Sequence, residues 1–265
     1  MSRIAARFEE LKKTNRAAFI PFITAGDPSG DVTAQMLEKL PAAGADLIEL
    51  GVPFSDPMAD GPAIQAASQR ALKGGMTLTK VLDLVRRFRK SDAKTPIVLM
   101  GYYNPIHKYG TALFAKDAVE AGIDGLITVD LPPEEDDVLR LPAASHGLDI
   151  VRLATPTTND ERLKTILNGA GGFLYYVSIT GVTGTKSFEE DNVHAAVARL
   201  QGATGLPCAV GFGIKTPERA AAVAKFADAA VVGSAIVDRI ASGAGVDATI
   251  AYCKELAEAV HGARV

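Results

Sequence analysis

The chain has 265 residues, 48% of them apolar, together with 25 glycines and 14 prolines. This is long for one ordinary domain but normal for one (β/α)8 barrel, and it allows a large buried core. The formal net charge of −3 gives no support to a nucleic acid or another polyanion as the main partner.

The chain begins with an amphipathic segment. Ile4, Phe8 and Leu11 recur at helical spacing, with charged residues on the other side. This pattern differs from the apolar block of a secretory signal peptide, and no later stretch approaches the roughly 20 apolar residues of a membrane span. We therefore expect a short additional N-terminal helix that covers the floor of a barrel.

Eight short apolar runs rich in β-forming residues follow, with helical periodicity between them. The predicted strands are Ala18–Thr24, Asp46–Gly51, Pro96–Gly101, Gly125–Val129, Asp149–Leu153, Phe173–Val177, Cys208–Val210 and Ala229–Gly233. Dividing the chain by eight gives about 33 residues per unit, which fits a strand and its returning helix. The sequence predicts an α/β fold, a single (β/α)8 (TIM) barrel in which residues 1–265 form one domain.

An open doubly wound sheet is the structural alternative. Such a sheet usually has fewer strands and carries a glycine fingerprint after the first strand. Here the first strand ends in the segment Ile23–Pro28, which lacks that fingerprint. The barrel is therefore the simpler interpretation.

Glu49 is a charged residue late in the second predicted strand. Side chains alternate along a strand, so if Ile48 and Leu50 face the helices, Glu49 points with Leu47 into the mouth of the barrel. In this fold the site is built at the carboxyl ends of the strands. An unpaired carboxylate there is costly to desolvate, so its pKa should rise toward the range useful for a general acid or base. A solvated acid at a strand end is the alternative interpretation.

Two further carboxylates, Asp56 and Asp60, lie in the loop that follows. Gly61 permits a turn, and Pro62 is predicted as the first residue of the next helix. Asp60 could simply favour that helix start electrostatically, and Asp56 could be a turn residue before Pro57. Local sequence alone favours these structural roles.

Glycines follow the sixth, seventh and eighth predicted strands, at Gly181–Thr185, Gly211–Gly213 and Gly233–Ser234. Glycine lets backbone N–H groups approach an anion, and Ser234 begins a short predicted helix whose N-terminus favours negative charge. Barrel turns use glycine in any case, yet phosphate sites in this fold often use the loops after strands seven and eight. We therefore predict a phosphate site here.

Other patterns give weaker signals. The four histidines are scattered, so no metal site is predicted. Cys208 and Cys253 have neither metal-ligand spacing nor a disulfide pattern, which favours a reducing compartment and a cytoplasmic protein. Lys186 lies in a Gly/Thr loop rather than inside a strand, which argues against a Schiff-base lysine.

Five segments together resemble the tryptophan synthase alpha subunits. The longest, Glu49–Pro62, closely resembles the signature segment of that family. The others are Pro21–Pro28, Met100–Pro105, Gly181–Gly184 and Gly211–Ile214, in the family's order. They span nearly the whole chain, so the resemblance determines the expected fold and reaction more firmly than spacing does.

The resemblance implies a carbon–carbon lyase that cleaves indole-3-glycerol phosphate to indole and glyceraldehyde 3-phosphate by a retro-aldol reaction, without metal or organic cofactor. Glu49 would protonate the ring carbon that carries the side chain and take the proton of the side-chain hydroxyl. Asp60 would hold the indole N–H and stabilise the cationic ring. This division fits the chemistry, because indole is a poor carbanion leaving group until its ring is protonated.

The same resemblance implies a set of binding residues. The phosphate would be bound by Gly184, Gly213, Gly233 and Ser234, and Thr183 would belong to a mobile loop. The indole slot would be lined by Phe22, Met100, Ile127, Tyr175 and Phe212. Met100 stands where the family pattern has leucine, and Ile179-Thr180 stand where many relatives have Arg-Ser. The difference at Ile179-Thr180 bears on how the mobile loop that contains Thr183 closes.

A partner is implied as well, because alpha subunits of this family dock on a pyridoxal-phosphate beta subunit that consumes indole, in an alpha-beta-beta-alpha heterotetramer. The docking rim would consist of Asp56, Pro57, Met58 and Asn104. The nearest rival enzymes are other phosphate-binding barrels of the pathway, such as indole-3-glycerol phosphate synthase or phosphoribosylanthranilate isomerase. The synthase would need a lysine within the barrel strands, and none of the eight predicted strands contains one. A catalytically silent barrel that only activates a beta subunit is the other alternative, against which Glu49 and Asp60 argue.

Overall fold

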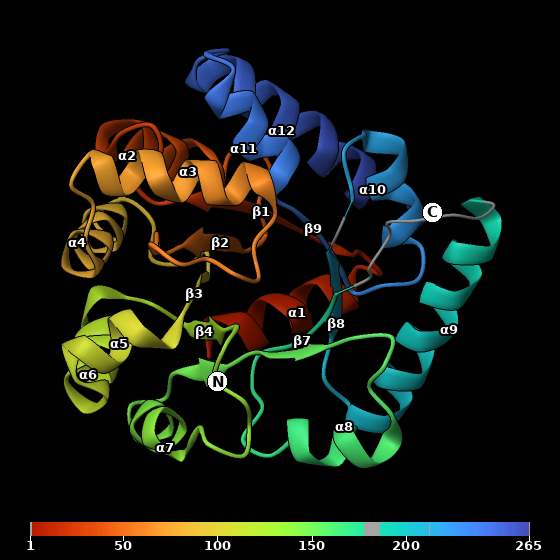
Figure 1. Cartoon of the computed structure of the whole chain (residues 1–265). Helices are drawn as coiled ribbons and strands as arrows, with labels where there is room; N and C mark the ends of the chain where they lie inside the picture. The colour runs from red at the N-terminus through yellow and green to blue at the C-terminus, as the bar shows by residue number, and fades with distance from the viewer. Residues whose placement is uncertain (1, 178–185, 212, 265) are drawn as a thin grey trace.

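The computed structural model describes residues 2–177, 186–211 and 213–264. Among these residues, nine parallel strands form one sheet in the order β5-β4-β3-β2-β1-β9-β8-β7-β6. They are β1 (Ala18–Thr24), β2 (Ile48–Gly51), β3 (Ile97–Gly101), β4 (Gly125–Thr128), β5 (Asp149–Ile150), β6 (Arg152–Ala154), β7 (Leu174–Val177), β8 (Cys208–Gly211) and β9 (Ala229–Val232). Figure 1 shows them as a central ring with helices outside it.

The short strands β5 and β6 are two halves of one barrel strand. Only Val151 separates them, and β5 pairs with β4 whereas β6 pairs with β7. The sheet therefore closes on itself through this strand. The predicted (β/α)8 barrel is confirmed, with its fifth strand in two pieces.

One or two helices follow most strands along the chain, and the helices other than α1 surround the ring (Figure 1). Those within the described residues are α1 (Arg3–Lys13), α2 (Gly30–Lys39), α3 (Pro62–Lys73), α4 (Leu78–Phe88), α5 (Tyr103–Tyr109), α6 (Thr111–Ala121), α7 (Asp137–Ser145), α8 (Asp160–Ile166), α9 (Lys186–Thr204), α10 (Pro217–Ala224), α11 (Ser234–Ala241) and α12 (Val246–His261). In the part of the chain that the structure describes, none of them is long and apolar enough to cross a bilayer.

The apolar core has an outer and an inner part, which follow the alternation along the strands. Ile48 and Leu50 pack in the cluster between the sheet and the helices, whereas Leu47 belongs to the cluster inside the barrel. The predicted N-terminal helix is α1, whose buried face (Ile4, Phe8 and Leu11) joins that inner cluster. In Figure 1 α1 lies across the ring rather than outside it, so it covers the barrel floor.

Candidate active site

A cavity of about 500 Å³ lies at the carboxyl ends of the barrel strands. It gathers eight residues that the sequence singles out, from segments far apart in the chain. They are Phe22, Glu49, Asp60, Met100, Tyr175, Gly213, Gly233 and Ser234. The fold therefore brings both candidate carboxylates and part of the candidate phosphate site into one space.

Glu49 is buried in the wall of this cavity. On β2 it pairs with Phe22 of β1 and Val98 of β3, and its side chain is 1% exposed. Neither carboxyl oxygen has a hydrogen-bond partner among the described residues. Burial, with a smaller contribution from the charge of Asp60, raises the pKa of Glu49 to about 8. The group therefore holds its proton at neutral pH.

Asp60 is less buried and has a different setting. Burial raises its pKa, and the nearby Tyr102 hydroxyl opposes this rise. Its backbone is fixed at both ends, because its N–H donates to Pro57 at 3.0 Å and its carbonyl accepts from Gln65 Nε2 at 2.8 Å. The helix start at Pro62 is confirmed, with Gly61 as the residue before α3.

Tyr102 is a site residue that the sequence did not identify. Its hydroxyl accepts a hydrogen bond from the Ala59 N–H at 2.9 Å, and its ring stacks on Phe54 with a centroid distance of 5.1 Å. The side chain is only 3% exposed. It therefore fixes the loop that carries Asp60, and its position directly after β3 was the available signal.

Two of the candidate phosphate residues, Gly233 and Ser234, lie at the start of α11. The Gly233 carbonyl accepts from the N–H groups of Ile236 and Val237, at 2.9 and 3.1 Å. The N–H groups of Ser234 and Ala235 come before the first helical hydrogen bond and have no carbonyl partner within the helix. They are therefore available to an anion. Gly213, at φ +71°, lies in the left-handed region that favours glycine. Lys215, which the sequence did not single out, adds a cation to the same wall. Gly184 and Thr183 lie outside the described residues.

The candidate indole slot is described in part. Phe22, Met100 and Tyr175 line the cavity, whereas Ile127 is 2% exposed and lies in the inner apolar cluster. Phe212 lies outside the described residues. The Tyr175 ring needs the glycine beside it, because a Cβ at Gly211 would lie 2.0 Å from the Tyr175 hydroxyl oxygen.

The candidate docking rim lies at the surface beside this cavity. Asp56 and Asn104 are exposed, and Pro57 is half-buried. Met58 is 86% exposed, the highest value among the exposed large apolar side chains of the described residues. Met58 is therefore accessible to a partner at this surface.

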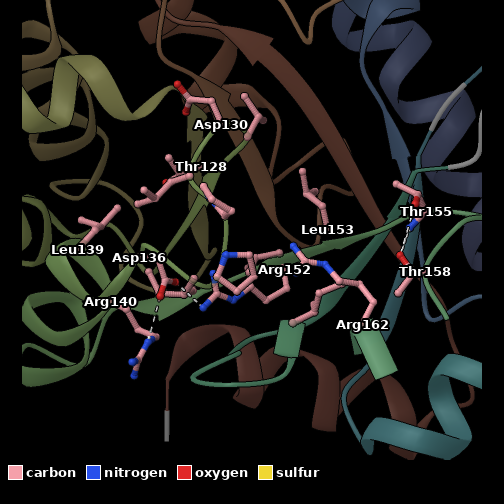
Figure 2. A pocket seen from close by; sticks show the side chains of 17 residues that line it. Thr128, Asp130, Asp136, Leu139, Arg140, Arg152, Leu153, Thr155, Thr158 and Arg162 are labelled. Carbon is pink, nitrogen blue, oxygen red and sulfur yellow. Dashed lines mark hydrogen bonds and ion pairs between the residues drawn. The ribbon is translucent and has the colours of Figure 1, made fainter. Parts of the chain in front are cut away.

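Arginines line a second cavity of about 340 Å³, beside β4 and β6 (Figure 2). Each of them has an acidic partner: Arg152 and Arg140 pair with Asp136, and Arg162 pairs with Glu134. Paired charges of this kind hold loops together, and Asp130, another acid in this wall, accepts a hydrogen bond from the Tyr103 N–H at 2.7 Å. In the described ranges no group of three or more His, Cys, Asp or Glu side chains could hold a metal ion. The unpaired carboxylate of Glu49 therefore makes the first cavity the candidate active site.

Comparison with known proteins agrees with this geometry. Residues 8–262 match the family model described as Tryptophan synthase alpha chain. The solved structure of tryptophan synthase subunit alpha from Legionella pneumophila str. Paris is 44% identical, with 98% of each chain covered and a TM-score of 0.92. A structure from Aquifex aeolicus VF5 is 35% identical, with 98% of this chain and 100% of that chain covered and a TM-score of 0.91. Tryptophan synthase from M. tuberculosis, in an open form with BRD0059 bound, is 33% identical, with 98% and 99% covered and a TM-score of 0.89.

Proposed function

The chain belongs to the tryptophan synthase alpha chain family, and we propose that Glu49 and Asp60 are the carboxylates with which it cleaves its substrate. As an alpha subunit it is a carbon–carbon lyase of tryptophan biosynthesis, and it converts indole-3-glycerol phosphate to indole and glyceraldehyde 3-phosphate. The observation that carries our assignment is the burial of Glu49 in the cavity wall with both oxygens unpaired.

Glu49 enters the reaction as an acid. With a pKa of about 8 it is protonated at neutral pH and can donate to the ring carbon that bears the side chain. The carboxylate so formed takes the proton of the side-chain hydroxyl while the carbon–carbon bond breaks. The electron pair of that bond returns to the ring, the hydroxyl carbon becomes the aldehyde, and Glu49 is protonated again for the next turnover.

Asp60 stabilises the charge that this protonation creates. A protonated indole ring is cationic, and an ionised carboxylate that accepts its N–H lowers the energy of that species. The Tyr102 hydroxyl counteracts the effect of burial on the pKa of Asp60, which favours the ionised form. Two carboxylates in different settings thus divide the acid and the electrostatic role.

The substrate's other groups fit the rest of the cavity. The phosphate would take the free N–H groups at the start of α11 and the turn at Gly213, with the charge of Lys215 nearby. The indole would lie against Phe22, Met100 and Tyr175. No step needs a group that the chain does not supply, so we propose a cleavage without cofactor.

The assignment is tested with Glu49→Gln, which keeps the shape of the side chain and removes the proton. A general acid contributes roughly 10²- to 10⁴-fold, so indole release should fall by at least about 10²-fold with a similar KM. Glu9→Gln, at an exposed position of α1, is the matched control and should leave the rate unchanged. A rate for Glu49→Gln within about threefold of wild type would contradict a role in proton transfer.

We also propose that the chain docks on a beta subunit through Asp56, Pro57, Met58 and Asn104, in an alpha-beta-beta-alpha heterotetramer with pyridoxal phosphate on the partner only. The exposure of Met58 supports this surface. One loop joins Met58 to Asp60, so docking would also position the carboxylate. Indole release should rise when the beta subunit is added, and less so with Met58→Ser. Equal rates with and without the beta subunit would count against the coupling.

Two coarser proposals complete the functional assignment. Residues 1–265 would form one domain, because every described strand belongs to one sheet. The protein would act in the cytoplasm, where free thiols such as Cys208 and Cys253 stay reduced. Expression of a fluorescent fusion and a fractionation of the cell would test the location.

A further inference from the structure

Six buried side-chain atoms of the described residues have no hydrogen-bond partner. Three belong to the substrate end of the barrel: both oxygens of Glu49, and the hydroxyl of Thr24 in a small pocket that adjoins Asp60. Arg152 contributes another, although its charge is paired with Asp136. The remaining two are the Nε atoms of Arg7 and Arg16. Buried polar atoms are almost always satisfied, so each exception calls for an explanation, such as a bound ligand.

Arg7 and Arg16 line a cavity of about 540 Å³ at the opposite end of the barrel from Glu49. Arg7 comes from α1 and Arg16 from the segment before β1. The wall also includes Lys94 from the segment before β3, Asp46 from the segment before β2, and His261 at the end of α12. Five segments of the chain therefore meet around this floor cavity.

The acids in this wall are already bonded. Asp46 accepts from the Phe19 N–H at 2.8 Å and lies 2.7 Å from His261 Nε2. Asp92 accepts from the N–H groups of Lys94 and Thr95, at 2.7 and 2.8 Å. Asp46 Oδ2 and both oxygens of Asp92 are thus directed to these donors, and neither acid forms an ion pair with Arg7 or Arg16.

The cations, in contrast, have few partners. Arg7 has one, Glu10 on the same helix, at 3.1 Å. Arg16 and Lys94 form no ion pair with any residue that the structure describes. Three positive side chains therefore line this cavity, and the Nε donors of both arginines have no partner among the described residues.

We propose that the floor cavity binds a small molecule that carries at least two oxyanion groups, phosphate or carboxylate. A guanidinium matches such a group with two parallel N–H donors, and both Arg7 and Arg16 line the cavity. Lys94 in the same wall supplies a third charge, which favours a ligand with more than one oxyanion group. The ligand would join α1 to the segments before β1 and β3, so it would stabilise the barrel from the end that carries no chemistry.

The test is a titration of the ¹⁵N-labelled protein with pyrophosphate and, separately, with citrate, with sodium chloride at equal ionic strength as the blank. Saturating glycerol 3-phosphate occupies the phosphate site at Gly233 and Ser234 beforehand, so that this site cannot take the probe. The Nε–H signals of Arg7 and Arg16 should shift with one probe or both. Pyrophosphate alone would identify a phosphate ligand, and citrate alone a carboxylate ligand. No shift with either probe would overturn the proposal.

Two variants locate the binding. Arg16→Gln should weaken binding of the probe about tenfold, and Lys94→Gln, at an exposed position, about threefold. Lys13→Gln and Lys90→Gln remove the same charge outside the cavity and should change nothing. The probe should also raise the Tm of the wild type by roughly 3 to 5 °C at about ten times its Kd. Shifts that persist unchanged in both Arg16→Gln and Lys94→Gln would overturn the site. Indole release should stay at the wild-type rate in all four variants.

Discussion

Replacing Glu49 by glutamine should stabilise the folded protein at neutral pH while it removes the catalytic proton. Burial raises the pKa of Glu49 from 4.5 to about 8, so between these values the folded protein keeps a proton that the unfolded chain has released. The contribution of this group to the free energy of unfolding is therefore fully present below pH 4.5, its pKa in the unfolded chain. As the pH rises toward about 8, the pKa in the folded protein, the contribution falls by about 1.4 kcal/mol per pH unit until it is lost. Between about pH 5.5 and pH 8 the loss is about 3 kcal/mol. The variant has an uncharged amide at this position, so its free energy of unfolding does not show this loss.

Urea unfolding of wild type and Glu49→Gln at about pH 5.5, 7 and 8.5 measures this difference. The variant's advantage in unfolding free energy should grow with pH and level off above about pH 8. Glu9→Gln, at an exposed position, should show no such trend. An advantage that is the same at every pH, or a variant that is less stable than wild type at pH 8.5, would refute the argument that burial holds the proton on Glu49.

Three further predictions test the surroundings of the site. Tyr102→Phe removes the acceptor of the 2.9 Å bond that fixes the Asp60 loop, so indole release should fall about tenfold for a stability loss of about 1 kcal/mol; an unchanged kcat would contradict this. Gly211→Ala places a Cβ 2.0 Å from the Tyr175 hydroxyl oxygen and 2.6 Å from its Cζ, so KM should rise severalfold, and this rise should be smaller in a Tyr175→Leu background that lacks the ring; an additive double variant would contradict the clash. Asp124→Asn breaks the ion pairs with two arginines at the floor and should cost about 3 kcal/mol in urea unfolding; a loss below about 0.5 kcal/mol would contradict a structural role.

Much of the site follows from rules that act within a few residues. The alternation along β2 places Glu49 on the inner side, because Ile48 and Leu50 pack against helices. The turn at Gly61 and the helix start at Pro62 follow from the local preferences of glycine and proline. Such features are predictable because the residues that decide them are adjacent in the chain.

Features that depend on distant contacts were not predictable in this way. The Tyr102 hydroxyl meets the Ala59 N–H only because β2 and β3 are neighbours in the sheet, and the two residues are 43 positions apart. Ile127 is one of the residues expected in the indole slot, yet it packs in the inner apolar cluster and is not among the residues that line the cavity. Periodicity gives the face on which a side chain lies, but depth along the barrel axis depends on the register of all the strands.

The carboxylates of the barrel divide by the end at which they lie. Asp46, Asp124 and Asp228 come just before strands, at the floor, and each accepts a backbone N–H of the neighbouring strand at 2.8 Å, from Phe19, Ile97 and Cys208 respectively. These hydrogen bonds join each of the three segments to the neighbouring strand. Glu49 lies at the other end and has no donor among the described residues. A barrel that gave Glu49 the same N–H partners would be more stable, but it would lower the pKa of that carboxyl and leave no proton to give to the indole ring at neutral pH.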